Sequence, residues 1–344
     1  MAAWVKGGAT DADGAVTAAA AILSAARAPV FAGLNAEVAA IRAAYRLAGR
    51  IGASVDSLGS AATYAELGAL ARVGAMTATP AEVFGRADVV LVVGDGPLET
   101  PYVERLRTTQ PSRGRAAGAP RDVLHLTGTP SLPVAVAALR AHARGHLDGD
   151  AGLLAIARAL SGARYGAVLY EPGEVGAPGI EMLQGMVVDL NEATRCFTLA
   201  LSGADQDRAA LQVSAWTTGQ AIRTGFGRRV PEHDPWRFDA ERLAASGEAD
   251  AALWLASLAA PAPGWLTGMP SVALVSGEVD PGAAEVVIQV GEPGREVGGV
   301  LWNPGRAALS YRAASAPAER PSAADIVDRI EAAIIERNAA RKDS

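Results

Sequence analysis

The sequence has a single cysteine, few aromatic residues and no long hydrophobic run. Cys196 alone cannot form a disulfide, a four-thiolate zinc site or an iron–sulfur cluster within the chain. No apolar run reaches the roughly 18 residues that a membrane-spanning helix needs. The first residues lack the charged flank and apolar centre of a signal peptide, so we expect a cytoplasmic protein. A net charge of −6 argues against nucleic acid or an anionic membrane as a partner.

Half of the 344 residues are hydrophobic, and the first part of the chain alternates between strand and helix patterns. Continuous Val and Leu at 88–94 indicate a strand that is covered on both faces, as in a parallel sheet. Such alternation predicts a doubly wound domain. The expected strands are 29–33, 53–56, 88–94 and 122–126, and the expected helices are 36–50, 61–72 and 80–86.

A polar, Gly-rich stretch at 145–152 separates this pattern from a second one. The second pattern has expected strands at 167–170, 196–201, 250–256, 271–275 and 285–290, and expected helices at 153–161 and 179–191. Short alternating segments at 298–301 and 306–311 predict a hairpin. Ser322 then caps a C-terminal helix in which Ile326, Ile330 and Ile334 share one face and anchor it to the body. We therefore predict an α/β protein of two doubly wound domains with mostly parallel sheets, 1–148 and 149–344.

Residues 55–97 carry a set of motifs in a fixed frame. The set comprises Asp56, Gly74, Glu82, Val83, Arg86, Ala87, Asp88, Gly94 and Pro97. Later come Leu190-Asn191 with Thr194-Arg195, and Trp216-Thr217-Thr218-Gly219. Together they resemble the B subunit of formylmethanofuran dehydrogenase, a tungsten- or molybdenum-pterin protein of the molybdopterin oxidoreductase superfamily. The resemblance covers roughly residues 14 to 320 and is most specific in the first block.

Two positions depart from that family. Its metal-ligand Cys and the adjacent His fall on Ala62 and Thr63, and neither a methyl group nor a hydroxyl replaces a thiolate on tungsten. The loop after the main strand reads Gly94-Asp95-Gly96-Pro97 and is followed by Glu99, which sets carboxylates where a pyrophosphate would bind. We interpret both as vestigial sites, and expect no catalytic residue, metal or cofactor in this chain.

A B subunit without redox centres resembles those of the bacterial formyltransferase/hydrolase complexes of methylotrophs. The resemblance implies a non-catalytic scaffold in a hetero-oligomer with a formyltransferase, a zinc-type hydrolase and the C subunit of such complexes. The whole assembly would move a formyl group from formyl-tetrahydromethanopterin to a methanofuran-like carrier and hydrolyse it to formate.

Two other functions remain open from the sequence. One is an oxidoreductase that still binds a pterin or nucleotide in its crevice through Asp56 and Thr63, because such crevices open at strand ends. The other is a domain of the thiamine-diphosphate type, since 25–55 and Gly94-Asp95-Gly96 resemble parts of those enzymes. The Asn-rich continuation that their diphosphate motif requires is missing, and the glycine spacing also differs from a dinucleotide fingerprint.

The histidines do not suggest a metal site. His142 and His146 are four residues apart, but Gly145 breaks the helix and no third ligand follows, so we expect a solvated helix end. His125 lies in a strand and is expected to be a hydrogen-bonded interior residue. His233-Asp234 belongs to a Pro-rich loop, where turn formation explains both residues.

The remaining polar candidates have structural explanations. Asp88, with Glu82 and Arg86 before it, is expected to serve a turn or cap, and Cys196 is expected to be buried in a strand. Ser57 and Ser60 lack the context of a nucleophile elbow.

Residues 110–121 form a Gly/Pro/Arg-rich loop that we expect to be mobile and solvated. Its Arg113, Arg115 and Arg121 suggest a second hypothesis, contact with a polyglutamyl carrier, which the sequence leaves open.

Overall fold

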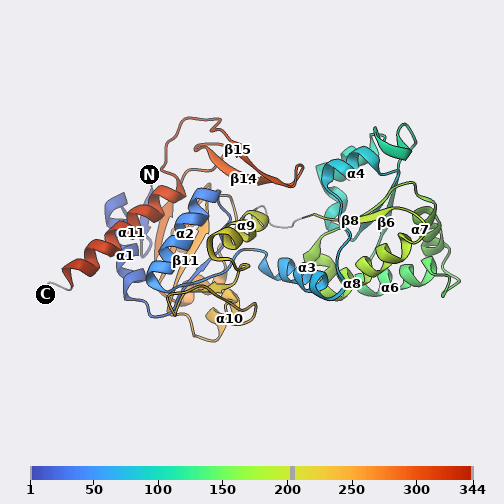
Figure 1. The fold of residues 1–344 in the computed structure, drawn as a ribbon. Coiled ribbons are helices and arrows are strands. Elements are labelled where there is room, and N and C mark those ends of the chain that lie inside the picture. Colours follow the sequence, from blue (N-terminus) through green and yellow to red (C-terminus); the bar gives the residue numbers. More distant parts are fainter. Residues whose placement is uncertain (1, 202–205, 342–344) are drawn as a thin grey trace. The chain divides into compact units, whose positions relative to one another are not determined.

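The computed structural model describes residues 2–201 and 206–341 and divides into two compact units (Figure 1). Unit 1 comprises Met1–Ser60, Ala204–Trp302 and Leu309–Ser344, and unit 2 comprises Ala61–Gly203 and Asn303–Ala308. This division differs from the predicted boundary between residues 148 and 149. The reason is strand pairing: β7 (Gly166–Tyr170), after that boundary, lies beside β5 (Val89–Val93), before it.

Unit 1 is built on a nine-stranded sheet in the order β10-β9-β4-β3-β11-β12-β13-β1-β2. Its middle strands, from β4 to β13, run parallel, and the pairs at both edges are antiparallel. The strands are β1 (Ala3–Val5), β2 (Gly8–Thr10), β3 (Pro29–Ala32), β4 (Ser54–Val55), β9 (Thr224–Gly225), β10 (Glu232–His233), β11 (Ala251–Ala256), β12 (Ser271–Val275) and β13 (Val286–Gln289).

Helices cover both faces of this sheet, as alternation along β3 requires. Val30 and Ala32 point into a cluster with α10 and η3, so Phe31, which is also fully buried, points to the other face. Helices α1, α2, α9 and α11 pack against one another. The elements are α1 (Ala12–Ala25), α2 (Val38–Ile51), α9 (Asp207–Thr218), α10 (Ala240–Ala245), η3 (Gly264–Gly268) and α11 (Ala323–Ala340).

The C-terminal helix α11 is anchored as predicted. Ser322 accepts a hydrogen bond from the Asp325 backbone and Asp325 returns one, which completes a capping box. Ile326, Ile330 and Ile334 are fully buried, and the helix packs on α1 and α2. Before it, β14 (Gly299–Asn303) and β15 (Ala308–Arg312) form the predicted two-stranded hairpin.

Unit 2 is a parallel sheet in the order β6-β5-β7-β8 with helices on both faces. Along β5, Leu91 and Val93 join a cluster with α6, α7 and α8, while Val90 and Val92 join a cluster with α4 and α5. The remaining elements are α3 (Ser60–Val73), α4 (Pro80–Arg86), η1 (Gly96–Glu99), α5 (Pro101–Arg107), η2 (Gly114–Ala116), β6 (Asp122–Leu126), α6 (Leu132–Ala143), α7 (Ala151–Gly162), α8 (Pro172–Leu190) and β8 (Cys196–Ala200).

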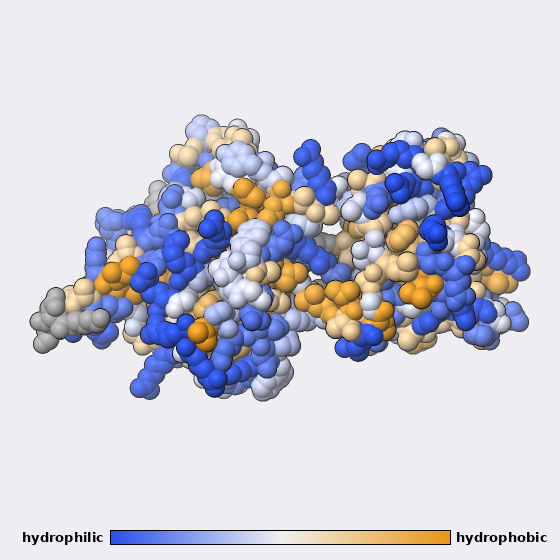
Figure 2. All heavy atoms as spheres, viewed as in Figure 1, coloured by the Kyte–Doolittle hydropathy of each residue, from blue (hydrophilic) through white to orange (hydrophobic). Residues whose placement is uncertain are grey.

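Both units thus confirm the predicted α/β class with mostly parallel sheets. In α8 the backbone is broken at Gly176, whose φ of 69° lies in the left-handed region, and the predicted helix 179–191 is the part after Pro178. Figure 2 shows hydrophilic residues over most of the viewed face of each unit. Within 2–201 and 206–341, no helix is both long and apolar enough to cross a bilayer.

Candidate functional site

The positions that correspond to the lost metal ligand lie in the first turn of α3, in unit 2. Ala62 faces the start of α8, since a Cβ added to Gly173 would lie 3.8 Å from the Ala62 Cβ. Thr63 is 1% exposed, and its Oγ1 has no hydrogen-bond partner among the described residues. Neither side chain offers a thiolate, so the donor set at this position does not fit tungsten or molybdenum.

The loop after β5 presents its backbone N–H groups to a carboxylate of the same chain. Gly94 has a φ of 82°, and the N–H groups of Asp95 and Gly96 then both donate to Glu174. The distances are 2.8 Å to Oε1 and 3.1 Å to Oε2. Successive N–H groups that converge in this way bind anions, and Pro97 begins the following turn without adding a donor. The anion bound here is Glu174.

Other acidic groups surround the same loop. A Cβ added to Gly96 would lie 2.4 Å from Glu171 Oε2, so this second carboxylate also reaches the loop. Burial and the charge of Glu174 raise the pKa of Glu171. On the other side, His125 Nε2 lies 3.1 Å from the Gly94 carbonyl oxygen and 3.2 Å from Asp95 Oδ1. The predicted polar contacts of His125 are therefore confirmed, although its side chain is partly exposed.

These residues do not fit a pterin dinucleotide. Its pyrophosphate requires free N–H donors and cations, whereas here the donors are engaged and carboxylates line the loop. In the described part of the chain, no group of three His, Cys, Asp or Glu side chains has an arrangement suited to a metal ion.

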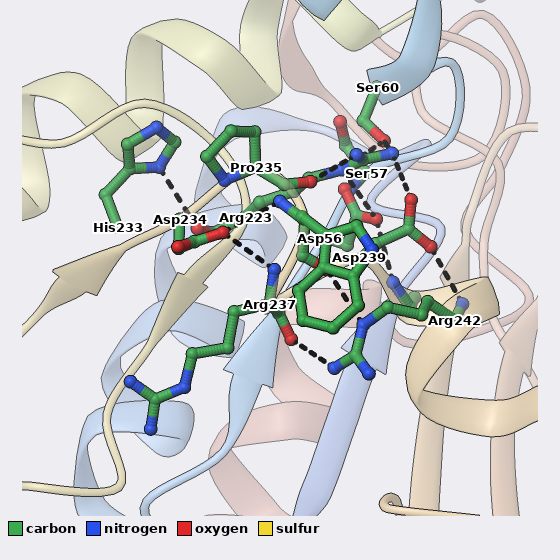
Figure 3. Close-up of polar contacts among 12 residues, drawn as sticks. Asp56, Ser57, Ser60, Arg223, His233, Asp234, Pro235, Arg237, Asp239 and Arg242 are labelled. Atoms are coloured by element: carbon green, nitrogen blue, oxygen red, sulfur yellow. Dashed lines mark hydrogen bonds and ion pairs between the residues drawn. The ribbon is translucent and has the colours of Figure 1, made fainter. Parts of the chain in front are cut away.

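Asp56 lies in unit 1, where β4 ends, and is held by a buried polar network (Figure 3). It is 4% exposed and accepts hydrogen bonds from the backbone of Ser57 at 2.8 Å and of Ala240 at 3.0 Å. Arg223 Nε lies 3.3 Å from its Oδ2. Burial raises the pKa of Asp56, and the Arg223 charge opposes that rise.

Arg223 connects the parts of this network. Its Nη2 lies 2.6 Å from Asp239 Oδ2, and its Nε and Nη2 donate to Ser60 Oγ at 3.2 and 3.0 Å. Its Nη1 donates to the Pro235 carbonyl. Sequence reasoning missed Arg223, because ordinary loop spacing surrounds it. Asp56 and Ser60 are therefore committed to fixing the segment 223–240 onto the sheet, and Ser57 Oγ is buried without a hydrogen-bond partner in the described residues.

The structural roles predicted for the acidic residues near β5 are confirmed. Asp88 accepts hydrogen bonds from the backbone of Arg164 at 3.1 Å and Tyr165 at 2.9 Å. Glu82 forms a capping box with Thr79 at the start of α4, and these hydrogen bonds lower the pKa of Glu82. Arg86 closes the same helix in its last turn.

The histidine predictions are partly corrected. His142 is 4% exposed and its Nδ1 has no hydrogen-bond partner among the described residues, so it is not part of a solvated helix end. His146 is exposed. The turn around His233 and Asp234 is confirmed, because Asp234 accepts from the backbone of Trp236 and Arg237. Cys196 is buried in β8 as predicted, and burial raises the pKa of its thiol to about 12.

The arginine-rich loop is more firmly attached than we expected. The Arg121 guanidinium donates to the carbonyls of Phe84, Ala87, Leu106 and Thr109. Arg113 Nη2 donates to the Ala81 carbonyl at 3.2 Å, and its backbone N–H bonds Gly85. Arg121 is therefore a structural residue and not a solvated cation, and Arg115 is the exposed member of the three.

Comparison with known proteins gives a near-full-length match. No family model matches the chain. The B subunit of the formyltransferase/hydrolase complex Fhc from Methylorubrum extorquens is 52% identical over 98% of this chain and 99% of its own length. The chain belongs to this family of B subunits. A chain in the crystal structure of the Fhc complex FhcABCD from the same organism, in complex with methylofuran, superposes with a TM-score of 0.92 at 51% identity, covering 98% and 99% of the two chains.

A more distant relative connects these B subunits to a redox enzyme. The B subunit of the tungsten-containing formylmethanofuran dehydrogenase 2 from Methanocaldococcus jannaschii is 27% identical over 61% of this chain and 56% of its own length. Membership among the Fhc B subunits favours the resemblance found in the motifs over the alternative of a thiamine-diphosphate domain.

Proposed function

We propose that this chain is the non-catalytic scaffold, or B, subunit of a formyltransferase/hydrolase complex. The observation that carries this proposal is 52% identity, over almost the whole chain, to the B subunit of such a complex. The similarity extends over both units, so it includes the surfaces of each. In the absence of a thiolate at Ala62 and of a free anion site at Gly94–Gly96, no redox role remains for the chain.

The proposed complex serves one-carbon metabolism in the cytoplasm. A formyltransferase chain moves the formyl group from formyl-tetrahydromethanopterin to a methanofuran-like carrier, and a zinc-type hydrolase chain releases formate. The B and C subunits together hold these two active sites at a fixed distance, so that the carrier passes between them. Arg115 remains available for contact with an acidic carrier arm, whereas Arg121 is held by backbone carbonyls.

Reconstitution tests the scaffold role. The four chains of the complex are co-expressed with an affinity tag on the hydrolase, and the mass of the particle and its formate release are measured with and without the scaffold chain. We expect the four-chain particle to form only when this chain is present. Formation of a particle with full formate release when the scaffold chain is omitted would contradict the proposal.

A cofactor-binding oxidoreductase is the second candidate, because of the similarity to the tungsten-containing protein. Metal analysis and ultraviolet–visible spectra of the purified chain separate the two. We expect no stoichiometric tungsten or molybdenum and no pterin chromophore, in the original chain and in Ala62→Cys alike, because the loop at Gly94–Gly96 is closed in both. Stoichiometric metal in the original chain would overturn the scaffold proposal.

A further inference from the structure

Two backbone N–H groups of unit 2 converge on one carboxylate at the end of a parallel sheet. The groups belong to Asp95 and Gly96, and the 2.8 and 3.1 Å distances to Glu174 are those of charge-assisted hydrogen bonds. They lie where β5 ends, which is the edge at which open α/β sheets bind their ligands. The position and the donors are those of an anion site, but the anion is covalently part of the chain.

The neighbouring strand delivers this carboxylate. Strand β7 pairs in parallel with β5, with Val93 opposite Tyr170, and α8 begins directly after it. Glu174 therefore lies in the first turn of α8 and reaches across to the loop. The fit requires glycine at Gly94, because a Cβ there would lie 2.4 Å from Glu174 Oε2.

We propose that Glu174 is a built-in anion that closes the Gly94–Gly96 loop to phosphate-bearing ligands. Removal of its side chain frees two convergent N–H donors and removes one negative charge, and so opens a site for inorganic pyrophosphate. The same residue explains why this loop does not fit a dinucleotide cofactor. The inference concerns unit 2 alone and goes beyond the scaffold role, because it assigns the exclusion to one side chain.

The groups around the loop set how strongly the opened site binds. Glu171 reaches Gly96 and Asp95 carries its own carboxylate, and both repel an added anion. His125, 3.2 Å from Asp95 Oδ1, partly offsets that repulsion when it is protonated. A second variant that also neutralises Glu171 should therefore bind more tightly than the single one.

Titration calorimetry with sodium pyrophosphate, without divalent metal and at constant ionic strength, tests the proposal. The variants are Glu174→Ala, Glu174→Gln and the double variant Glu171→Gln/Glu174→Ala. Glu192→Ala is the matched control, since it removes one exposed carboxylate from just beyond the other end of α8. We expect Glu174→Ala to bind at least about tenfold more tightly than the original chain, which is the size of one charge-assisted hydrogen bond. The control should match the original chain.

Amide chemical shifts locate the binding. In Glu174→Ala, pyrophosphate should shift the Asp95 and Gly96 N–H resonances, and it should raise the melting temperature of this variant but not that of Glu192→Ala. Equal affinity of the original chain and Glu174→Ala would overturn the proposal, as would folded single and double variants that bind no pyrophosphate. If Glu174→Ala does not fold, Glu174→Gln decides by the same titration, because its neutral amide gives up the site more easily than a carboxylate. Either failure leaves assembly with the partner chains unaffected, so it is distinguishable from failure of the scaffold role.

Discussion

The two units hold a carboxylate at a strand end in different ways. In unit 1, Asp56 is buried and faces a guanidinium, so its charge is balanced by Arg223, whose side chain is only 11% exposed. In unit 2, Glu174 is exposed to solvent and is held by the backbone of the Gly94–Gly96 loop. A buried charge depends on its partner, whereas an exposed one has water as an alternative. The two arrangements should therefore differ greatly in what their removal costs.

Arg223→Ala should have the largest effect. It leaves Asp56 buried without its cation and also releases Asp239 and Ser60, which costs about 3–5 kcal/mol in the free energy of unfolding of unit 1. All six tryptophans of the sequence lie in the three segments of unit 1. Urea denaturation followed by tryptophan fluorescence therefore measures this unit.

The control for that measurement is Arg228→Ala. Arg228 forms an ion pair with Glu232, but its side chain is 73% exposed, so the loss should stay below about 1 kcal/mol. Similar losses in the two variants would mean that the network around Asp56 is not a buried one.

Glu331→Gln should have an intermediate effect, again in unit 1. Burial acts to raise the pKa of Glu331, but hydrogen bonds from Arg46 at 2.7 Å and Arg50 at 2.6 Å outweigh it and lower the pKa. We expect a loss of about 1–3 kcal/mol, because the substitution weakens two charge-assisted bonds between α2 and α11. Glu336→Gln, exposed on the same helix, is the control and should lose almost nothing.

The same pair gives a pH dependence with a definite sign. Because the folded-state pKa of Glu331 is lowered, its contribution is complete above the unfolded pKa of about 4.3 and is lost as pH falls through the folded value. The difference between the original chain and Glu331→Gln should therefore shrink below about pH 4. A difference that grows on acidification would contradict the assignment.

Glu174→Ala should destabilise unit 2 by only about 1 kcal/mol, since water replaces the carboxylate at both N–H groups. Hydrogen exchange at the amides of β5 and β7 measures the stability of this unit. A loss as large as that of Arg223→Ala would remove the distinction between the two arrangements.

Cys196 should show the smallest effect of all. Burial raises the pKa of its thiol to about 12, so the thiol of the folded protein stays protonated and should resist iodoacetamide at about pH 8 until urea unfolds unit 2. Its raised pKa adds stability that is complete below about pH 8.5 and is lost as pH rises toward 12. Rapid alkylation of the native chain, followed by mass spectrometry, would contradict this.

The local structure was predictable because periodicity records burial. The continuous Val and Leu of β5, the capping residue Ser322 and the isoleucines of α11 all describe short-range patterns, and the structure confirms them. Strands β1 and β2 were missed, since three residues are too few to show a period. The division into units was also missed, because pairing between distant strands leaves no periodic signal.

The site was predictable only where a residue had been lost. Ala62 could be compared with a family pattern, but the partners of Asp56 and of the Gly94–Gly96 loop could not. Arg223 and Glu174 are remote in sequence from the groups they bind, and nothing in their own surroundings marks them. The Arg121 loop was misjudged for the same reason, because carbonyl acceptors are present at every residue.

Unit 1 is assembled from both ends of the chain, whereas almost all of unit 2 is one continuous segment. During translation, unit 2 can fold soon after residue 203 leaves the ribosome. The N-terminal strand β1, made first, has to wait for its neighbour β13, which is made near the end. The apolar face of the nascent N-terminal segment thus stays open for most of synthesis, which is when a chaperone would engage it.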